Sequence, residues 1–386
     1  MLRNYIVTAL RFLAKNQMFA SVNTIGLAVS ISCAMLIYLY VKNELTYDEF
    51  HRDIDRLYIL GEGSRQGGSP EEAAYYQTVY PALPAMMEEF PEIETGTRTF
   101  DWDSHILIAN DKKFMQQVVY ADSTFFQTLS FSLVKGNPET ALAGKKHIVI
   151  SEDLAGRFFN TTDVLGKTIA FENAKEYVIS GVMAKVPPNS SLRFEALLPM
   201  MEKEDEQGFP EMANWYNTIA QVFVKVKPGT DVRKLQAKFG AFVKQHYDAA
   251  AKERVLKLFP LADLRQSEAS NETSIYGLMS IGIFILIIAV INFINLSIAT
   301  SLKRLRETGM RKVMGSSKRS IVLQFFLEAL ILTTVAIIIS LGLLEILLPV
   351  LNDVLALSLG LSSGNIAEIA VLSLALALLI SMMAGG

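Results

Sequence analysis

The sequence predicts an α-helical membrane protein with four transmembrane helices and a large extracytoplasmic α+β domain inserted between helices 1 and 2. Hydrophobic residues make up 51% of the 386-residue chain and charged residues only 19%, an apolar excess that a soluble domain does not need for its core. This excess is concentrated in four long runs. Between the first two runs lies a long polar segment with mixed strand and helix patterns.

The four runs are long enough to cross a bilayer as helices, which takes roughly 20 apolar residues. They occupy residues 18–41, 275–299, 321–348 and 366–383. The first run is longer than the core of a signal peptide and no small-residue cleavage site accompanies it, so we interpret it as a span. The third run includes Glu328, an intramembrane polar residue near one end, where a carboxyl group can reach the interface or a partner helix.

Lys and Arg residues predict the orientation, since they are enriched on the cytoplasmic flanks of spans. Residues 1–17, an amphipathic segment expected to be helical, carry three of them, and residues 300–320 carry seven. Both segments are therefore predicted to be cytoplasmic. Residues 349–365 have neither Lys nor Arg and are expected to form a short outside loop. Residues 42–274, with 26 Lys and Arg against 34 Asp and Glu, are then outside as well.

Local patterns within residues 42–274 predict an α+β domain. The stretches "KHIVIS" and "KEYVISGVM" are rich in β-branched residues, as short strands are. Ser151 is a candidate N-cap for a helix with acidic residues in its first turn, and Thr230 precedes a second helical pattern. The apolar positions of that second pattern are spaced by three and four: Val232, Leu235, Phe239 and Val243.

No catalytic constellation, cofactor motif or thiolate metal cluster is visible in the sequence. The four His residues are scattered, Cys33 is the single cysteine, and the nearest match to a phosphate-binding loop, "GNPETALAGKKH", has the wrong glycine spacing. One group, Glu44, Asp48, His51 and Asp55, would share a face if its segment were helical. That face allows metal ligation, but without further ligands a solvated helix face is the favoured interpretation.

The basic segment between the second and third runs, "SLKRLRETGMRKVMGSSKRSIVLQFF", has an imperfect apolar stripe on a predicted short helix. Gly315 is a candidate helix C-cap and Ser316 or Ser317 a candidate start for the next helix. Two interpretations are open. The segment can be a topology anchor on anionic headgroups, or a surface that docks into a cytoplasmic partner and passes its motion into the adjoining spans.

The order of parts resembles the permease subunits of the FtsX-like and MacB-like ABC transporter family, along nearly the whole chain. The stretch "RETGMRKVMGSSKRSIVLQFFLEAL" is similar to the family signature after the second span. In the inserted segment, "DSTFFQTLSFSLVKGNPETAL", "IVISEDLAGRFF", "DVLGKTIAF" and "YVISGVMAKVPPNSSLRF" resemble the family's periplasmic core domain in the same order. "LRNYIVTALRFLAKN" and "NELTYDEFHRDIDRLY" resemble the branch common in Bacteroidetes. The signature residues in register are Glu307, Gly309, Arg311, Lys312, Gly315 and Glu328.

The resemblance implies a mechanotransmission permease in a bacterial inner membrane, multi-pass, with the N-terminus in the cytoplasm and the large domain in the periplasm. A separate ATPase subunit would bind ATP and Mg, leaving this chain without cofactor, and its movement would drive export or extraction of a substrate outside the membrane. The coupling helix would lie within residues 300–320, with Gly309 allowing close approach and Arg311 and Lys312 meeting acidic groups. The expected contact residues are Leu305, Arg306, Glu307, Thr308, Gly309, Met310, Arg311, Lys312, Val313, Met314 and Gly315.

Other partners and functions remain open at this stage. The family members that this chain resembles often continue into a second copy of the same layout, so we expect either a second permease half or a homodimer partner. A periplasmic adaptor or a lipoprotein substrate is a further expected partner, and nucleic acid is not. The alternative function is a membrane receptor whose outside domain binds a ligand and signals to a cytoplasmic protein; a membrane-bound enzyme ranks third.

Overall fold

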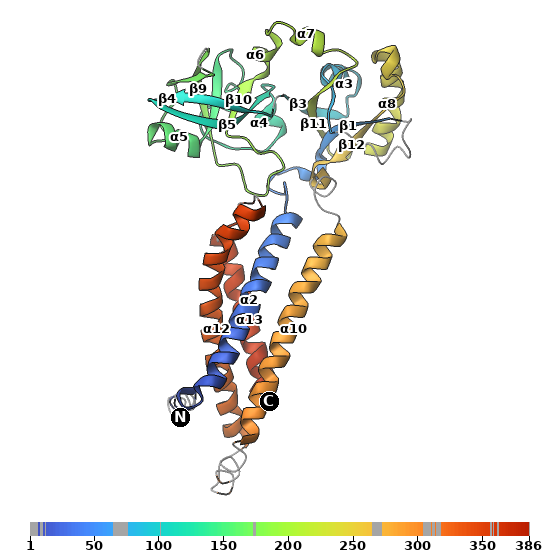
Figure 1. Ribbon diagram of the computed structural model, residues 1–386. Coiled ribbons are helices and arrows are strands. Elements are labelled where there is room, and N and C mark those ends of the chain that lie inside the picture. Colours follow the sequence, from blue (N-terminus) through green and yellow to red (C-terminus); the bar gives the residue numbers. More distant parts are fainter. Residues whose placement is uncertain are drawn as a thin grey trace. The chain divides into compact units, whose positions relative to one another are not determined.

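The computed structural model describes residues 7, 11, 13–64, 76–100, 102–172, 175–264, 272–303, 310, 313, 318–355, 357, 359–360 and 363–385. The chain divides into two compact units (Figure 1). The first is a helical unit of residues 1–45 and 270–386. The second, called the inserted domain below, comprises residues 46–269. An α+β domain between the first and second of four apolar helices confirms the predicted fold class.

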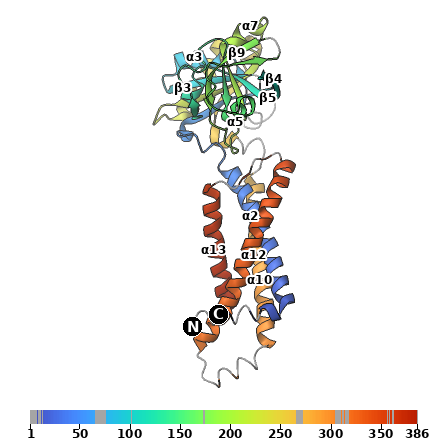
Figure 2. The ribbon, with the colours of Figure 1, turned by 90° about the vertical axis from the view of Figure 1, so that its left-hand side faces the viewer.

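The helical unit contains four helices that are long and apolar enough to cross a membrane (Figures 1 and 2). They are α2 (Gln17–Leu45), α10 (Glu272–Lys303), α12 (Lys318–Leu355) and α13 (Ser363–Gly385). Each helix contains one of the predicted apolar runs and extends beyond it at both ends. The polar residues on either side of each run are therefore helical as well. Their helical hydrogen bonds pair the backbone N–H and C=O groups at the ends of the apolar run.

The third span differs most from the sequence-based boundaries. We expected the loop to begin at Pro349, whereas α12 continues through this proline to Leu355. Proline removes one helical hydrogen bond, a loss that a long helix packed against neighbours tolerates. Asn352 then closes the helix end, because its side chain donates to the Leu359 carbonyl at 2.8 Å and accepts from the Leu359 amide at 2.8 Å.

Helix α2 packs along α10 and α12, and α13 packs on α12 (Figure 2). The buried stripe of α2 recurs every three or four residues and consists of Leu27, Ala28, Ile31, Met35 and Leu39. Small residues in the facing helices, Ala289, Ala329 and Ala336, let the helix backbones approach. In α10, a Cβ atom at Gly282 would lie only 3.2 Å from Ile37 of α2, so glycine permits this close approach.

The inserted domain alternates strands with short helices and 3₁₀ turns, the latter labelled η. In chain order the elements are η1 (Ile54–Arg56), β1 (Leu57–Ser64), β2 (Thr78–Val79), α3 (Ala82–Glu89), β3 (Ile93–Phe100), β4 (Ser104–Ala109), β5 (Lys112–Ala121), α4 (Phe125–Thr128), β6 (Leu133–Lys135), β7 (His147–Ser151), α5 (Glu152–Phe159), β8 (Thr168–Phe171), β9 (Lys175–Met183), β10 (Ala196–Pro199), α6 (Met200–Glu204), α7 (Phe209–Met212), β11 (Thr218–Val226), α8 (Val232–His246), η3 (Ala249–Ala251), β12 (Arg254–Pro260) and η4 (Leu261–Asp263). The stretches "KHIVIS" and "KEYVISGVM" contain β7 and β9, as predicted.

Ten of the described strands follow one another in one hydrogen-bonded sheet in the order β10-β7-β9-β8-β4-β5-β3-β11-β1-β12, while β2 pairs with β11 and β6 with β9. Strand β10 also pairs with β5, in parallel, so the first six strands of this order close into a ring. The remaining four strands extend from β5 as an antiparallel sheet. Helices α3 and α8 pack on this second part, and α5 packs on β7 and β9 of the ring (Figure 1).

Both faces of the sheet are buried where the two parts meet. On β5, Val118 and Tyr120 contribute to one hydrophobic core, and Val119 and Ala121 to a second. Strands β7 and β11 alternate in the same way. Because neighbouring side chains on a strand point to opposite faces, continuous apolar runs such as "HIVI" are what a doubly covered strand requires.

Helix ends follow local sequence signals. The Ser151 hydroxyl accepts the Leu154 amide at 3.0 Å, which confirms the predicted N-cap of α5. At α8 the cap is Asp231 and not Thr230, since the Asp231 carboxylate accepts the Lys234 amide at 3.2 Å. Leu235, Phe239 and Val243 are buried, as the spacing predicted, and Val232 is half-buried against the same core.

The glycine in "LVKGNPETAL" is expected to be indispensable to the inserted domain. Gly136 has φ +98°, and a Cβ atom there would lie 2.7 Å from the Ser180 carbonyl oxygen. We expect Gly136→Ala to lower the free energy of unfolding by roughly 2 to 4 kcal/mol, through backbone strain and overpacking. Both tryptophans, Trp102 and Trp215, lie in the inserted domain, so their fluorescence during denaturant unfolding of the full chain reports on this domain alone.

The matched control is Gly240→Ala, at an exposed position in α8 with no atom within 4 Å of the added Cβ. This substitution is expected to raise the free energy of unfolding by about 0.5 to 1 kcal/mol, because alanine favours the helix. Equal effects of the two substitutions would contradict the close approach at Gly136.

Candidate functional site

Most of the predicted coupling residues lie outside the described part of the chain. Of residues 305–315, the structure describes Met310 and Val313 alone, and both are helical. Their side chains are 65% and 90% exposed, although both are apolar. Helix α10 ends at Lys303 and α12 begins at Lys318, so the basic segment is the direct connection between two long helices.

Glu328 lies in α12 and is buried, with 6% of its surface exposed. Its side chain accepts a hydrogen bond of 2.9 Å from Gln324, one helical turn earlier, which is also buried. A carboxyl group in an apolar layer requires polar partners, and the amide of Gln324 supplies one.

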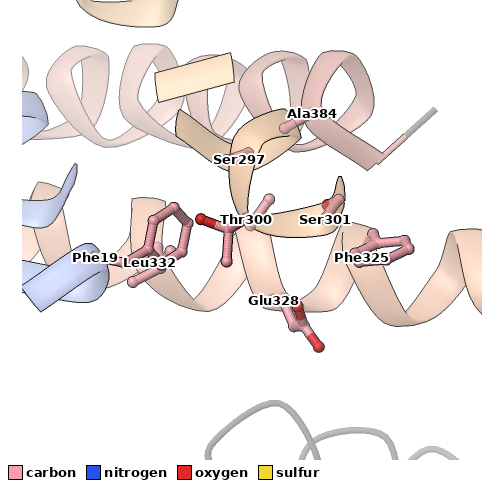
Figure 3. A pocket seen from close by; sticks show the side chains of 9 residues that line it. Phe19, Ser297, Thr300, Ser301, Phe325, Glu328, Leu332 and Ala384 are labelled. Carbon is pink, nitrogen blue, oxygen red and sulfur yellow. The ribbon is translucent and has the colours of Figure 1, made fainter. Parts of the chain in front are cut away.

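A small pocket beside Glu328 is lined by all four long helices (Figure 3). The lining residues are Phe19 of α2, Ser297, Thr300 and Ser301 of α10, Phe325, Glu328, Ala329 and Leu332 of α12, and Ala384 of α13. One carboxyl group, three hydroxyl groups and two aromatic rings give this pocket a mixed lining. Glu328 therefore belongs to the region where the four helices converge, near the ends of α10 and α12 that adjoin the basic segment.

A second polar cluster ties α2 to α13 near the opposite ends of these helices. Lys42 of α2 forms an ion pair with Glu368 of α13 and donates to Asn365 at 3.0 Å. Tyr38, one turn before Lys42, donates to Glu368 at 2.9 Å. Polar groups close to the ends of membrane helices can join neighbouring helices while remaining near the interface.

The first residues of the inserted domain, Thr46–His51, form a turn that we call the junction segment. Asp48 within it has φ +60°, a left-handed conformation that aspartate adopts more readily than most residues. Asp48 and His51 are 0% and 1% exposed. The chain therefore leaves α2 and enters the inserted domain through a tight, buried turn.

Hydrogen bonds fasten the junction segment to the loop between β9 and β10. The Asp48 amide donates to the Asn189 carbonyl at 2.8 Å, and the Asn189 side chain donates back to the Thr46 carbonyl at 2.6 Å. The Ser191 amide donates to the Asp48 carboxylate at 2.9 Å, and Arg193 donates to the Tyr47 hydroxyl at 3.1 Å. Bonds run in both directions, so neither partner can move without breaking several of them.

His51 fastens the same segment to the loop after α4. Its Nδ1 accepts the Ser130 amide at 3.1 Å, and the Arg52 amide donates to the Ser130 hydroxyl at 3.1 Å. The imidazole ring lies among the rings of Phe50 and Phe131, with centroids 4.1 and 5.3 Å away. Burial among these rings lowers the pKa of His51 from 6.5 to about 4, so the ring is neutral at pH 7.

The expected helical face of Glu44, Asp48, His51 and Asp55 does not exist, because α2 ends at Leu45. Glu44 is buried in α2, and Asp48 and His51 are buried in the turn, so a solvated helix face was the wrong interpretation. Within the described residues, no three His, Cys, Asp or Glu side chains are placed to hold a metal ion. Sequence spacing could not reveal the turn, since it depends on the left-handed conformation of Asp48 and on hydrogen bonds to a distant loop.

Two family models match the chain along most of its length. The model of the MacB-like periplasmic core domain matches residues 20–242, and that of the FtsX-like permease C-terminal region matches residues 279–385. The chain belongs to the MacB-like and FtsX-like ABC transporter permeases. The periplasmic core domain precedes the permease region in the chain, as the order of the sequence motifs predicted.

Curated relatives carry corresponding names. An uncharacterized ABC transporter permease of Bacillus subtilis, YknZ, is 24% identical over 52% of this chain and 48% of its own length. The macrolide export ATP-binding/permease protein MacB of Bdellovibrio bacteriovorus is 24% identical over 56% of this chain and 36% of its own length. The chain thus matches about half or less of each of these relatives.

Solved structures of permease domains also resemble this permease. A domain of a Porphyromonas gingivalis permease protein is 26% identical, covers 54% of this chain and 92% of that one, and has a TM-score of 0.47. The periplasmic region of MacB from Actinobacillus actinomycetemcomitans is 15% identical, covers 55% and 92%, and has a TM-score of 0.41.

The sequence motifs of this permease acquire physical roles in the inserted domain. "VPPNSSLRF" is the loop that clasps the junction segment, and "DSTFFQTLSF" supplies Ser130 and Phe131 around His51. "IVISEDLAGRFF" spans β7 and the N-capped helix α5. Local sequence gives no sign that the first of these stretches binds the segment after the first span, because the two are about 140 residues apart.

The low pKa of His51 makes the stability of the inserted domain pH-dependent. Protonation is favoured in the unfolded chain below pH 6.5 but in the folded chain only near pH 4, so stability is complete above pH 6.5 and is lost as pH falls toward 4. The expected loss is about 3 kcal/mol, from 1.36 kcal/mol per pKa unit. Tryptophan-monitored unfolding of the full chain at pH 7, 6, 5 and 4.5 measures it.

The control variant is His51→Asn, which keeps an acceptor for the Ser130 amide but does not titrate. Carboxylates elsewhere titrate equally in both proteins, so the difference between the two pH profiles isolates His51. Parallel profiles from pH 7 to 4.5 would contradict the buried neutral imidazole.

Proposed function

We propose that this permease couples ATP hydrolysis in a separate ATPase subunit to movement of the inserted domain. ATP and Mg bind to the ATPase, and this chain supplies the helices that carry the movement. The work is export or extraction of a substrate on the far side of the membrane from the ATPase. One curated relative, the macrolide export ATP-binding/permease protein MacB, combines an ATP-binding part and a permease part in its name.

The observation that carries the proposal is the connection of the inserted domain at both ends to the helical unit. Its first residue, Thr46, follows α2 directly, and its last residues lead into α10. Helix α2 packs along both α10 and α12 through a continuous apolar core. Displacement of these helices is therefore passed to both ends of the domain.

The lengths of the helices support transmission over the full width of a membrane. Helices α10 and α12 contain 32 and 38 residues, and at 1.5 Å per residue they extend about 48 and 57 Å. The basic segment connects them. A push on this segment acts on the ends of two stiff helices at once, and the exposed apolar side chains of Met310 and Val313 suit a protein contact.

The basic segment also supports the orientation. With Lys and Arg concentrated at residues 300–320 and before α2, we place these parts in the cytoplasm and the inserted domain outside it, in the periplasm of a bacterial cell. The partners are then a cytoplasmic ATPase, the lipid bilayer and a second permease half or a second copy of this chain. A drug, peptide or lipoprotein from the outer surface of the membrane is the substrate class.

Charge reversal in the basic segment tests the ATPase contact. We expect Arg311→Glu with Lys312→Glu to abolish co-purification of the ATPase and ATP-dependent activity, because two attractions to acidic groups become repulsions. Affinity purification of the tagged full chain, followed by an assay of bound ATPase activity, measures both effects. The stability of the inserted domain, followed by tryptophan fluorescence, should not change.

Arg319→Glu is the matched control, because Arg319 is exposed in the first turn of α12 and lies outside residues 305–315. It should retain the ATPase. Retention of ATPase and activity by the double variant would refute the coupling contact. Recovery of a kinase in place of an ATPase would favour the receptor function.

A further inference from the structure

Several hydrogen bonds tie the junction segment, which follows α2 in the chain, to one loop of the inserted domain. Asn189 is the central residue, since its carbonyl accepts the Asp48 amide and its side chain donates to the carbonyl of Thr46 and, at 3.3 Å, to its hydroxyl. Asp48 completes the joint by accepting the Ser191 amide. We call Asp48 and Asn189, with these bonds, the clasp.

The clasp lies ahead of the first strand of the domain. The chain turns at Asp48 and runs nine residues further before β1 begins at Leu57. The loop that receives these bonds connects β9 to β10, two strands of the closed ring that flank β7. A pull on Thr46 therefore reaches the ring through the clasp before it reaches β1 through the backbone.

The surroundings of the clasp make it stiff. Ser190, between Asn189 and Ser191, is fully buried, and Tyr47 is nearly so. The His51 ring and its bond from Ser130 hold the other end of the junction segment against the second hydrophobic core, where Phe131 lies. The clasp bonds themselves are part-buried, which strengthens them relative to bonds fully exposed to water.

We infer that the Asp48–Asn189 clasp is the joint through which movement of α2 enters the ring of the inserted domain. This inference rests on the proposed function, because it assigns a route to the movement that the ATPase generates. Asp48 and Asn189 are positioning residues in this route. They act by geometry and not by charge transfer or ligand binding.

The test uses the full chain in complex with the ATPase that co-purifies with it. Hydrogen exchange of residues 46–52 and 186–193 is measured by mass spectrometry, with and without Mg-ATP. In the wild type we expect nucleotide to change exchange in both stretches. In Asn189→Asp, which loses the donor to the Thr46 carbonyl at constant side-chain shape, the response of residues 186–193 should fall at least fivefold while ATP hydrolysis continues.

Conservative and matched variants separate the joint from a merely structural role. Asp48→Asn keeps an acceptor and tolerates the left-handed backbone, so it should retain the wild-type response, whereas Asp48→Ala should lose it. Without nucleotide, Asp48→Ala should exchange the Ser191 amide about tenfold faster, because this amide loses its acceptor, the Asp48 carboxylate. Asn214→Ala removes comparable side-chain bonds, to the amides of Tyr216 and Asn217 in another loop, and should change neither result.

The experiment distinguishes failure of the clasp from failure of the proposed function. If Asn189→Asp and Asp48→Ala respond to Mg-ATP as the wild type does, the clasp is not the joint and the proposed function stands. The same conclusion holds if the wild-type complex hydrolyses ATP with no change at residues 186–193. If no ATPase binds the wild-type chain, the proposed function falls and the inference falls with it. Exchange of the β7 amides, which should be equal in all variants, identifies any variant that fails to fold.

Discussion

The packing of α2 between α10 and α12 is the interaction on which the rest of the structure depends. In a bilayer the hydrophobic effect does not drive helices together, because lipid tails are as apolar as the side chains. Close van der Waals contact between small residues must therefore hold the helices together. Ala28 in α2 and Ala329 and Ala336 in α12 supply that contact. Because α2 runs directly into the inserted domain, this packing also decides which helices can move the domain.

The inserted domain is suited to receive movement as a stiff body. Strand β5 belongs both to the closed ring and to the antiparallel extension, and its two faces line two separate cores. A strand buried on both faces and paired on both edges cannot shift without disturbing both cores. A displacement that enters the ring is thus shared with the second part of the sheet.

The sequence predicted those features that depend on composition or on local periodicity. The four spans, the strands β7 and β9 and the Ser151 cap all follow from apolar runs, β-branched residues and capping chemistry. Features set by distant contacts could not be predicted. Continuation of α12 past Pro349 depends on packing, and the turn at Asp48 depends on bonds to Asn189, which is 141 positions away in the chain. The coupling residues 305–315 stay a prediction from sequence, apart from the exposure of Met310 and Val313.

The two ends of the proposed route use different physics, and this difference has a functional consequence. In the proposed function, the basic segment would bind its partner through charge, which salt screens over about 8 Å at physiological ionic strength, so this contact is expected to be reversible and rapid. The clasp uses part-buried hydrogen bonds, most of them to backbone groups, and a buried, neutral histidine beside them. Such bonds are insensitive to salt. The proposed route therefore combines a screened contact at one end with part-buried hydrogen bonds at the other, so its two ends are expected to respond differently to salt.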